Sequence, residues 1–212
     1  MKNTQGVTMD MMKLHGLAVT KEIKKSMTII DMPFRTYDNK FLAYRNAKSL
    51  IKYTNANFVK LEINKSKISI IKYLTDKGIN VIAHIGVTPQ KYKNFKKIKV
   101  KGRSNKEISS LVQLAVSAEK AGAKLILLEC ITETAAKKII KTIGVPSIGI
   151  GASKYCSGQV LVFDDIIDLV PIKNNTKFIK KFANSQTLYK LAINKFVRDV
   201  KNGKFPSKKH SY

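Results

Sequence analysis

The chain is poor in cysteine, acidic residues and long apolar runs, and each shortage excludes a class of protein. It has no tryptophan, two cysteines and 14 acidic residues among 212. No apolar run approaches the roughly 20 residues that a membrane-spanning helix needs, and the polar segment 1–10 lacks the apolar middle of a signal peptide. We therefore expect a cytoplasmic protein with no membrane contact, in which Cys130 and Cys156 are reduced thiols.

The net charge of +26 raises a nucleic-acid hypothesis. The positive charge is almost all lysine, because arginine occurs only at Arg35, Arg45, Arg103 and Arg198. Base-reading sites favour arginine, whose planar fork makes bidentate contacts. The lysines are spread along the chain, with one dense run at 91–101. We interpret them as solvated residues on helix faces and do not expect a nucleic-acid partner.

Short runs rich in valine and isoleucine alternate with longer segments of helical periodicity, and this pattern predicts parallel strands joined by helices. The length and the hydrophobic content of 44% suit a single domain over 1–212. The expected strands are 27–34, 58–63, 79–86, 124–130, 145–151 and 159–163. The expected helices are 7–23 with Thr8 as its cap, 41–53, 68–77, 105–121, 134–142 and a long amphipathic stretch at 177–201.

Such a sheet either closes into a barrel or stays open and doubly wound. A dinucleotide-binding loop would favour the open sheet, but no G-x-G-x-x-G motif follows a first strand. The nearest match, 149–154, comes late and has Lys154 at the third glycine position. We interpret that segment as the end of a strand.

Ionisable residues stand near the carboxyl ends of four expected strands: Asp31, Lys60 with Glu62, His84, and Glu129. Buried strands carry charges only where these are paired, metal-bound or functional. In (β/α) barrels the active site lies at the carboxyl ends of the strands. The pattern therefore favours a barrel with its active site at these positions.

Simpler explanations exist for each of these residues taken alone. Asp31 could cap the turn before Pro33, and His84 could be a buried core histidine. Lys60 and Glu62 are two apart, so they share a strand face and could form a plain ion pair.

The chemistry of the full set points to enolisation of a 2-oxo acid. Asp31 and Glu62 suit a hard divalent ion such as Mg²⁺, which prefers oxygen ligands. Lys60 is a candidate clamp for an anionic substrate. Glu129 follows an almost wholly apolar run, so it is expected to have a shifted pKa or a neighbouring cation, and it is a candidate base.

Ordered sequence blocks then indicate a family. They are Asp31-Met-Pro-Phe34, Val59-Lys-Leu-Glu62, Ala83-His-Ile-Gly-Val-Thr-Pro-Gln90, Lys99-Val-Lys-Gly-Arg103, Leu128-Glu-Cys130, Ile148-Gly-Ile-Gly-Ala152, Gly158-Gln-Val-Leu-Val162, and a tail with Gly203-Lys-Phe-Pro206 and His210-Ser-Tyr212. Together they resemble the successive blocks of ketopantoate hydroxymethyltransferase, from about Val7 to Tyr212. Each block is weak alone, but the ordered set is specific.

The resemblance implies a homo-oligomeric, Mg²⁺-dependent TIM-barrel enzyme, decameric in the family. That enzyme transfers a hydroxymethyl group from 5,10-methylenetetrahydrofolate to 3-methyl-2-oxobutanoate and so makes 2-dehydropantoate for pantothenate synthesis. By motif, Asp31 matches a metal ligand that also meets the substrate, and Glu62 matches a second metal-site carboxylate. Lys60 matches the substrate-binding lysine, His84 an active-site histidine, and Glu129 the proton acceptor.

The chain departs from the family pattern at several points. The family barrel has eight strands, whereas this sequence predicts six and lacks the Val-Gly-Asp-Ser-Leu-Gly block that supplies a metal ligand and a substrate clamp. Ala83, Ile63-Asn64 and segment 94–98 replace family glycines, which changes the loops over the site. We expect a (β/α)8 barrel incomplete at its N-terminus, with weakened Mg²⁺ binding and two unpaired strand edges.

Three hypotheses account for the incomplete barrel: the start lies at an internal methionine of a longer gene, the protein is an inactive relict, or another chain fills the gap. Two other functions stay open. One is a related Mg²⁺ enolate enzyme of the phosphoenolpyruvate mutase or isocitrate lyase kind, and the other is a basic protein that binds nucleic acid or a protein partner.

Overall fold

The computed structural model describes residues 3–93, 98–170 and 176–212, and it divides the chain into two compact units, Met1–Val160 and Leu161–Tyr212. Residues 94–97, which belong to the basic run at 91–101 and to the departure at 94–98, lie outside the described residues.

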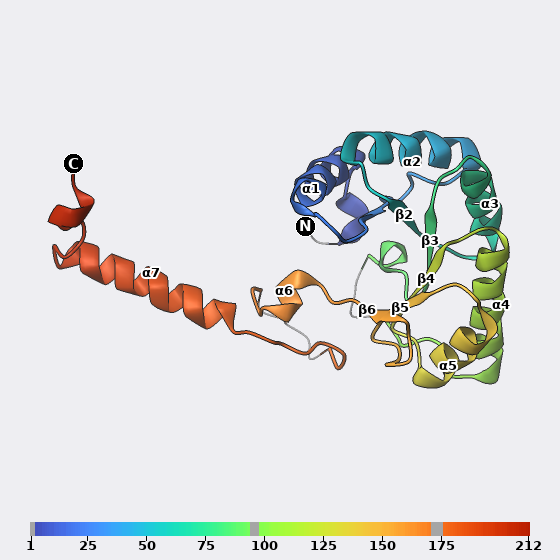
Figure 1. The fold of residues 1–212 in the computed structure, drawn as a ribbon. Helices are drawn as coiled ribbons and strands as arrows, with labels where there is room; N and C mark the ends of the chain where they lie inside the picture. The colour runs from blue at the N-terminus through green and yellow to red at the C-terminus, as the bar shows by residue number, and fades with distance from the viewer. Residues whose placement is uncertain (1–2, 94–97, 171–175) are drawn as a thin grey trace. The chain divides into compact units, whose positions relative to one another are not determined.

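The first unit contains one sheet of six parallel strands, in which each strand pairs with the next along the chain. The strands are β1 (Ile29–Asp31), β2 (Phe58–Glu62), β3 (Val81–Gly86), β4 (Leu125–Glu129), β5 (Ser147–Ile150) and β6 (Gly158–Gln159). The sheet curls, with helices arranged around its outer side (Figure 1). Consecutive parallel order, curvature and an outer helical layer are the features of a TIM barrel, so the predicted incomplete barrel of about six strands is confirmed.

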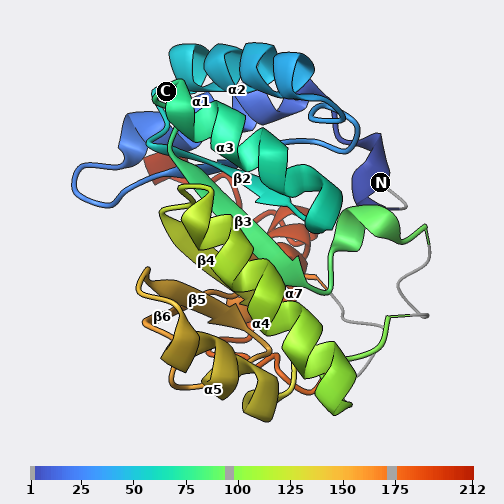
Figure 2. The ribbon, with the colours of Figure 1, turned by 90° about the vertical axis from the view of Figure 1, so that its right-hand side faces the viewer.

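Five α-helices connect or flank these strands: α1 (Met9–Glu22), α2 (Lys40–Thr54), α3 (Ile68–Asp76), α4 (Asn105–Lys120) and α5 (Glu133–Thr142). Short 3-10 turns add η1 (Thr4–Gly6), η2 (Lys65–Lys67) and η3 (Pro89–Lys91). Figure 2 shows α3 and α4 lying along the outer side of the central strands. Thr8 caps α1 as predicted, since its hydroxyl accepts a hydrogen bond from the N–H of Met11 at 3.2 Å.

Fully buried aliphatic side chains fill the space between the sheet and the helices. Leu61, Ile85 and Leu128 alternate along their strands with the polar residues of the opposite face, and Leu50 and Ile139 meet them from the helices. The sheet thus has an apolar outer face and an inner face on which polar side chains are possible near the strand ends.

The first and last strands are shorter than predicted. β1 ends at Asp31 rather than at 34, because Pro33 has no N–H with which to extend the ladder. β6 spans two residues rather than 159–163, because the chain turns at Val162, whose carbonyl accepts from the N–H of Asp165 at 3.0 Å and begins the next helix.

The second unit contains the short helix α6 (Phe163–Ile166), α7 (Ser185–Lys201) and the 3-10 turn η5 (Lys208–His210). α7 begins later than the predicted stretch at 177–201. Asn184 caps it by accepting from the N–H of Thr187 at 3.2 Å, while the N–H of Phe182 donates to Ile166 at 2.8 Å and is not available for a helix. In the described residues, no helix combines the length and apolar character needed to cross a membrane.

Candidate active site

The carboxyl ends of β1 to β4 bring the five predicted site residues to one end of the sheet. The strand register pairs Asp31 with Lys60, and Glu62 with His84. Glu129 ends β4, opposite Gly86 at the end of β3. Because the strands are parallel and adjacent, residues separated by almost a hundred positions in sequence become neighbours.

The side chains form a chain of polar contacts. Lys60 Nζ lies 3.0 Å from Asp31 Oδ2 and 3.5 Å from His84 Nδ1. His84 Nε2 lies 3.2 Å from Glu129 Oε2, and His84 Nδ1 lies 4.0 Å from Glu62 Oε1. Lys60 therefore pairs with Asp31 rather than with Glu62. His84 lies close to Lys60, Glu62 and Glu129, so it is not an isolated core residue.

His84 is the most deeply buried member of the set, with a side chain only 1% exposed. Burial lowers its pKa, and the neighbouring Lys60 charge lowers it further, against the opposing effect of Glu129. The ring is thus neutral near pH 7. Because the ammonium of Lys60 can only donate, Nδ1 is assigned as the acceptor and Nε2 carries the proton on the side of Glu129. The Nε2–Oε2 approach does not have hydrogen-bond geometry, so this buried N–H is left without a hydrogen-bond partner.

Glu62 is a buried carboxyl group whose pKa is raised to about 7. Burial is the largest cause, and the negative charges of Glu129 and Asp31 act in the same direction. Lys60 and a backbone N–H hydrogen bond oppose the shift without cancelling it. The ionised form of Glu62 is therefore short of compensating positive charge.

Gln90 is a supporting residue that the sequence did not single out. Its backbone N–H donates to both Glu62 oxygens, at 3.0 Å to Oε2 and 3.3 Å to Oε1. Its side-chain amide donates to the carbonyl of Met32 at 2.9 Å and accepts from the hydroxyl of Tyr37 at 2.5 Å. Gln90 thus ties the ends of β1 and β2 together and orients the Glu62 carboxylate.

Gly86 and Cys130 shape the end of β4. Gly86 has a φ of +103°, and a Cβ there would collide with the carbonyl oxygen of Glu129, so only glycine lets β3 pass this close. Burial and the charge of Glu129 raise the pKa of the Cys130 thiol to about 11. Cys130 and Cys156 are both free thiols, in agreement with the sequence prediction, and Cys130 stays protonated near neutral pH.

Asp31 and Glu62 are oxygen donors of the kind that Mg²⁺ takes from proteins. No group of three or more His, Cys, Asp or Glu side chains in the described ranges is arranged to hold a metal. Mg²⁺, however, often takes only one or two carboxylates from a protein and keeps several waters. Asp31 and Glu62 supply two carboxylates, and a divalent cation is the group that would stabilise the ionised form of Glu62.

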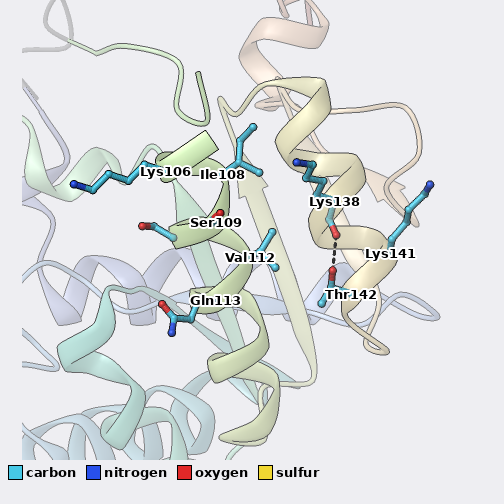
Figure 3. A pocket seen from close by; sticks show the side chains of 9 residues that line it. Lys106, Ile108, Ser109, Val112, Gln113, Lys138, Lys141 and Thr142 are labelled. Carbon is cyan, nitrogen blue, oxygen red and sulfur yellow. Dashed lines mark hydrogen bonds between the residues drawn. The ribbon is translucent and has the colours of Figure 1, made fainter. Parts of the chain in front are cut away.

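A hollow of about 760 Å³ elsewhere in the first unit is not part of this site (Figure 3). Only residues of α4 and α5, on the outside of the sheet, line it. Three lysines, Lys106, Lys138 and Lys141, are part of its lining, and none of the five predicted site residues is.

Comparison with known proteins agrees with the fold and the sequence blocks. The family model described as ketopantoate hydroxymethyltransferase matches residues 1–208. A 3-methyl-2-oxobutanoate hydroxymethyltransferase of Pelagibacter ubique is 44% identical over 210 residues, which cover 99% of this chain and 80% of the relative. The enzyme of that name from Clostridium beijerinckii is 41% identical, covering 99% of this chain and 76% of the relative.

Among solved structures, a phosphonopyruvate hydrolase superposes with a TM-score of 0.52 at 13% identity, covering 97% of this chain and 74% of that one. At that identity the likeness concerns the fold alone. The family model and the identities, each spanning nearly all of the chain, carry the assignment: this chain belongs to the ketopantoate hydroxymethyltransferase family.

Proposed function

We propose that the chain transfers a hydroxymethyl group from 5,10-methylenetetrahydrofolate to 3-methyl-2-oxobutanoate, giving 2-dehydropantoate. The observation that carries the proposal is the contact chain from Asp31 through Lys60 and His84 to Glu129, with Glu62 beside it, at the strand ends of a family member. Water supplies the hydroxyl oxygen, and tetrahydrofolate leaves.

Glu129 is the proton acceptor in this proposal. It takes the proton from C3 of the substrate, and the electron pair of the broken C–H bond forms the C2–C3 double bond of an enolate. Water releases the one-carbon unit from the folate as formaldehyde, and tetrahydrofolate leaves. The enolate attacks the formaldehyde carbon, and the new hydroxyl group takes up the proton from Glu129. The Glu129 side chain is 20% exposed, so a substrate can reach it, while buried His84 holds its N–H toward the same carboxylate. Lys60, whose side chain is 14% exposed, supplies positive charge for the substrate carboxylate.

Asp31 and Glu62 would hold Mg²⁺. A bound Mg²⁺ supplies Lewis-acid stabilisation of negative charge on the substrate's keto oxygen. The residues of this chain set the position: Gln90 orients Glu62, and Lys60 keeps Asp31 at the end of β1.

The same family membership supports a proposal on assembly and location. We infer a homo-oligomer that acts in the cytoplasm, with residues 1–212 serving as one catalytic domain. Its partners are the two substrates, without a membrane or a nucleic acid.

Deuterium exchange tests the chemistry without the second substrate. The protein is incubated with 3-methyl-2-oxobutanoate and Mg²⁺ in D₂O, and the C3 proton is followed by NMR. We expect Mg²⁺-dependent exchange that falls by about a hundredfold or more in Glu129→Gln, since a general base contributes about 10²–10⁴ in rate. Glu133→Gln, an exposed glutamate on α5, is the matched control. A folded wild-type protein that shows no exchange would contradict the proposal.

A further inference from the structure

Tyr37 is a buried tyrosine, 5% exposed, in the loop between β1 and α2, and the mechanism above leaves its hydroxyl group unused. The hydroxyl lies 2.5 Å from Gln90 Oε1 and donates to it, although the two residues are 53 positions apart. The orientation of the Gln90 amide is set by its nitrogen, which donates to the carbonyl of Met32 at 2.9 Å, so its oxygen faces Tyr37. Burial raises the pKa of Tyr37, and the charge of Glu62 raises it further, so the hydroxyl stays a donor.

Lys67 holds Tyr37 in place from η2, the turn that follows β2. Its Nζ donates to the backbone carbonyl of Tyr37 at 3.0 Å and lies 3.3 Å from Asp38 Oδ1. The same ammonium group lies 5.3 Å from the centroid of the Tyr37 ring, within the range of a cation–π contact. The Tyr37 hydroxyl is therefore a fixed donor and does not follow the movements of Gln90.

Gln90 uses its backbone and its side chain to hold two strand ends at once. Its backbone N–H binds both oxygens of Glu62 at the end of β2, and its side-chain amide binds the carbonyl of Met32, which directly follows Asp31 at the end of β1. Its own carbonyl accepts from Gln5 Nε2 at 2.9 Å. The orientation of the Gln90 amide therefore influences how the carboxylates of Asp31 and Glu62 lie relative to each other.

The hydrogen bond from Tyr37 keeps the Gln90 amide in this orientation. Gln90 is 9% exposed, so its amide oxygen would be buried without a partner if the Tyr37 hydroxyl were absent. A buried unpaired oxygen is unfavourable, and the amide would turn toward another donor. Turning the amide would break its bond to Met32 and release the end of β1 from Gln90.

We propose that Tyr37 is a positioning residue for the metal site of Asp31 and Glu62, and that it acts through Gln90. The inference rests on the function proposed above, in which these two carboxylates hold Mg²⁺. Residues that orient metal ligands through hydrogen bonds contribute strongly to metal affinity. Mg²⁺ is sensitive to such positioning because it demands a geometry close to octahedral.

Mn²⁺ binding to the full chain tests Tyr37 without turnover. Mn²⁺ takes the same oxygen ligands as Mg²⁺, and EPR measures the free ion during a titration. Tyr37→Phe keeps the ring and removes only the hydroxyl. We expect it to weaken Mn²⁺ binding about tenfold, the lower end of the effect of losing a group that orients a metal ligand.

Thr54→Val is the matched control for the loss of a buried hydroxyl. Thr54 is fully buried on α2, and its hydroxyl donates to the carbonyl of Leu50 at 2.7 Å, away from the strand-end carboxylates. Any change of Tm in Thr54→Val should leave Mn²⁺ affinity as in the wild type. A general loss of stability would instead lower both properties in both variants.

A double variant tests the route through Gln90. Gln90→Met removes the amide and keeps the backbone N–H that binds Glu62. If Tyr37 acts through the amide, adding Tyr37→Phe to Gln90→Met should cause no further loss of Mn²⁺ affinity, because changes at two coupled residues are not additive. A further loss by the same factor as in the wild-type background would overturn the inference.

Mn²⁺ binding and deuterium exchange separate the failure of this inference from the failure of the proposed function. The role of Tyr37 is overturned by equal Mn²⁺ binding in the wild type and Tyr37→Phe, by an equal loss in Thr54→Val, or by a wild type that binds no Mn²⁺, even where exchange is observed. A wild type without exchange, whose Mn²⁺ binding still depends on Tyr37, would contradict the proposed chemistry and support the positioning role.

Discussion

At the scale of single residues, the burial of Glu62 destabilises the ionised carboxylate that metal binding would use. Its side chain is 7% exposed, and its pKa is raised to about 7 from an ordinary value of 4.5. A carboxyl group with a raised folded-state pKa favours folding when protonated. The free-energy cost of burying the ionised carboxylate is absent below about pH 4.5. It grows as the pH rises and is fully present above about pH 7.

Replacing Glu62 by glutamine should therefore stabilise the metal-free protein at high pH. In EDTA at pH 8, we expect Glu62→Gln to unfold with a free energy about 1–3 kcal/mol higher than the wild type, with the difference almost gone near pH 4.5. Glutamine keeps an oxygen to accept the N–H of Gln90. Urea denaturation at several pH values measures the effect, and Glu133→Gln, whose carboxyl group is exposed with a lowered pKa, should show no such gain. An unchanged or lower stability at pH 8 would mean that burial does not penalise the ionised group.

At the scale of elements, the packing of α1 on the β1 end of the sheet depends on Gly16. A Cβ at this position would lie 2.6 Å from Ile30 Cδ1 and 2.8 Å from Thr54 Cγ2, closer than carbon atoms pack. Ile30 directly precedes Asp31, so the position of α1 is coupled to the candidate active site. Thr54 belongs to helix α2, so Gly16 also allows α1 to pack closely against α2.

Gly16→Ala sets helix propensity against packing. Alanine should favour a helix by about 1 kcal/mol, but the clash in a close-packed position costs about 1–3 kcal/mol. We expect a net loss of stability, seen as a lower Tm. His15→Ala, at the exposed neighbouring position, should be neutral or slightly stabilising. A raised Tm in Gly16→Ala would show that α1 can move away from Ile30 and Thr54 without cost.

At the scale of the whole molecule, the net charge of +26 favours non-specific attraction to anions. Family membership and the convergent strand-end residues favour the enzyme over a nucleic-acid-binding protein. The second unit adds α7, whose side chains are exposed or half-buried and include Lys190, Lys195, Arg198 and Lys201. We expect lysine charge spread in this way to produce weak, salt-sensitive binding to polyanions.

Electrophoretic mobility shifts with DNA and RNA should therefore depend steeply on salt. We expect complexes at about 0.05 M salt and their loss by about 0.2 M, because binding through phosphate contacts alone weakens by orders of magnitude over that range. Sequences of different composition should behave alike. A discrete complex that persists at physiological ionic strength on one sequence would revive the nucleic-acid hypothesis.

The sequence alone determined the order and type of the elements of the first unit. Valine- and isoleucine-rich runs require burial, and the helical periodicity between them requires parallel strands, so all six strands were predictable. The candidate residues could also be predicted, because an ionisable side chain at the end of a buried apolar strand has to be paired, metal-bound or functional. They are Asp31, Lys60, Glu62, His84 and Glu129. The ends of elements were less predictable, because the missing N–H of Pro33 and the side-chain cap of Asn184 decided them.

Only the tertiary structure decided which of these residues meet. Lys60 pairs with Asp31 on the neighbouring strand rather than with Glu62 on its own, and His84 lies between Lys60 and Glu129. Gln90 was missed because it holds Glu62 through a backbone N–H, which any residue except proline offers. Residue identity records what a side chain can do, whereas strand register and burial, which depend on the whole fold, decide what it contacts and how its pKa shifts.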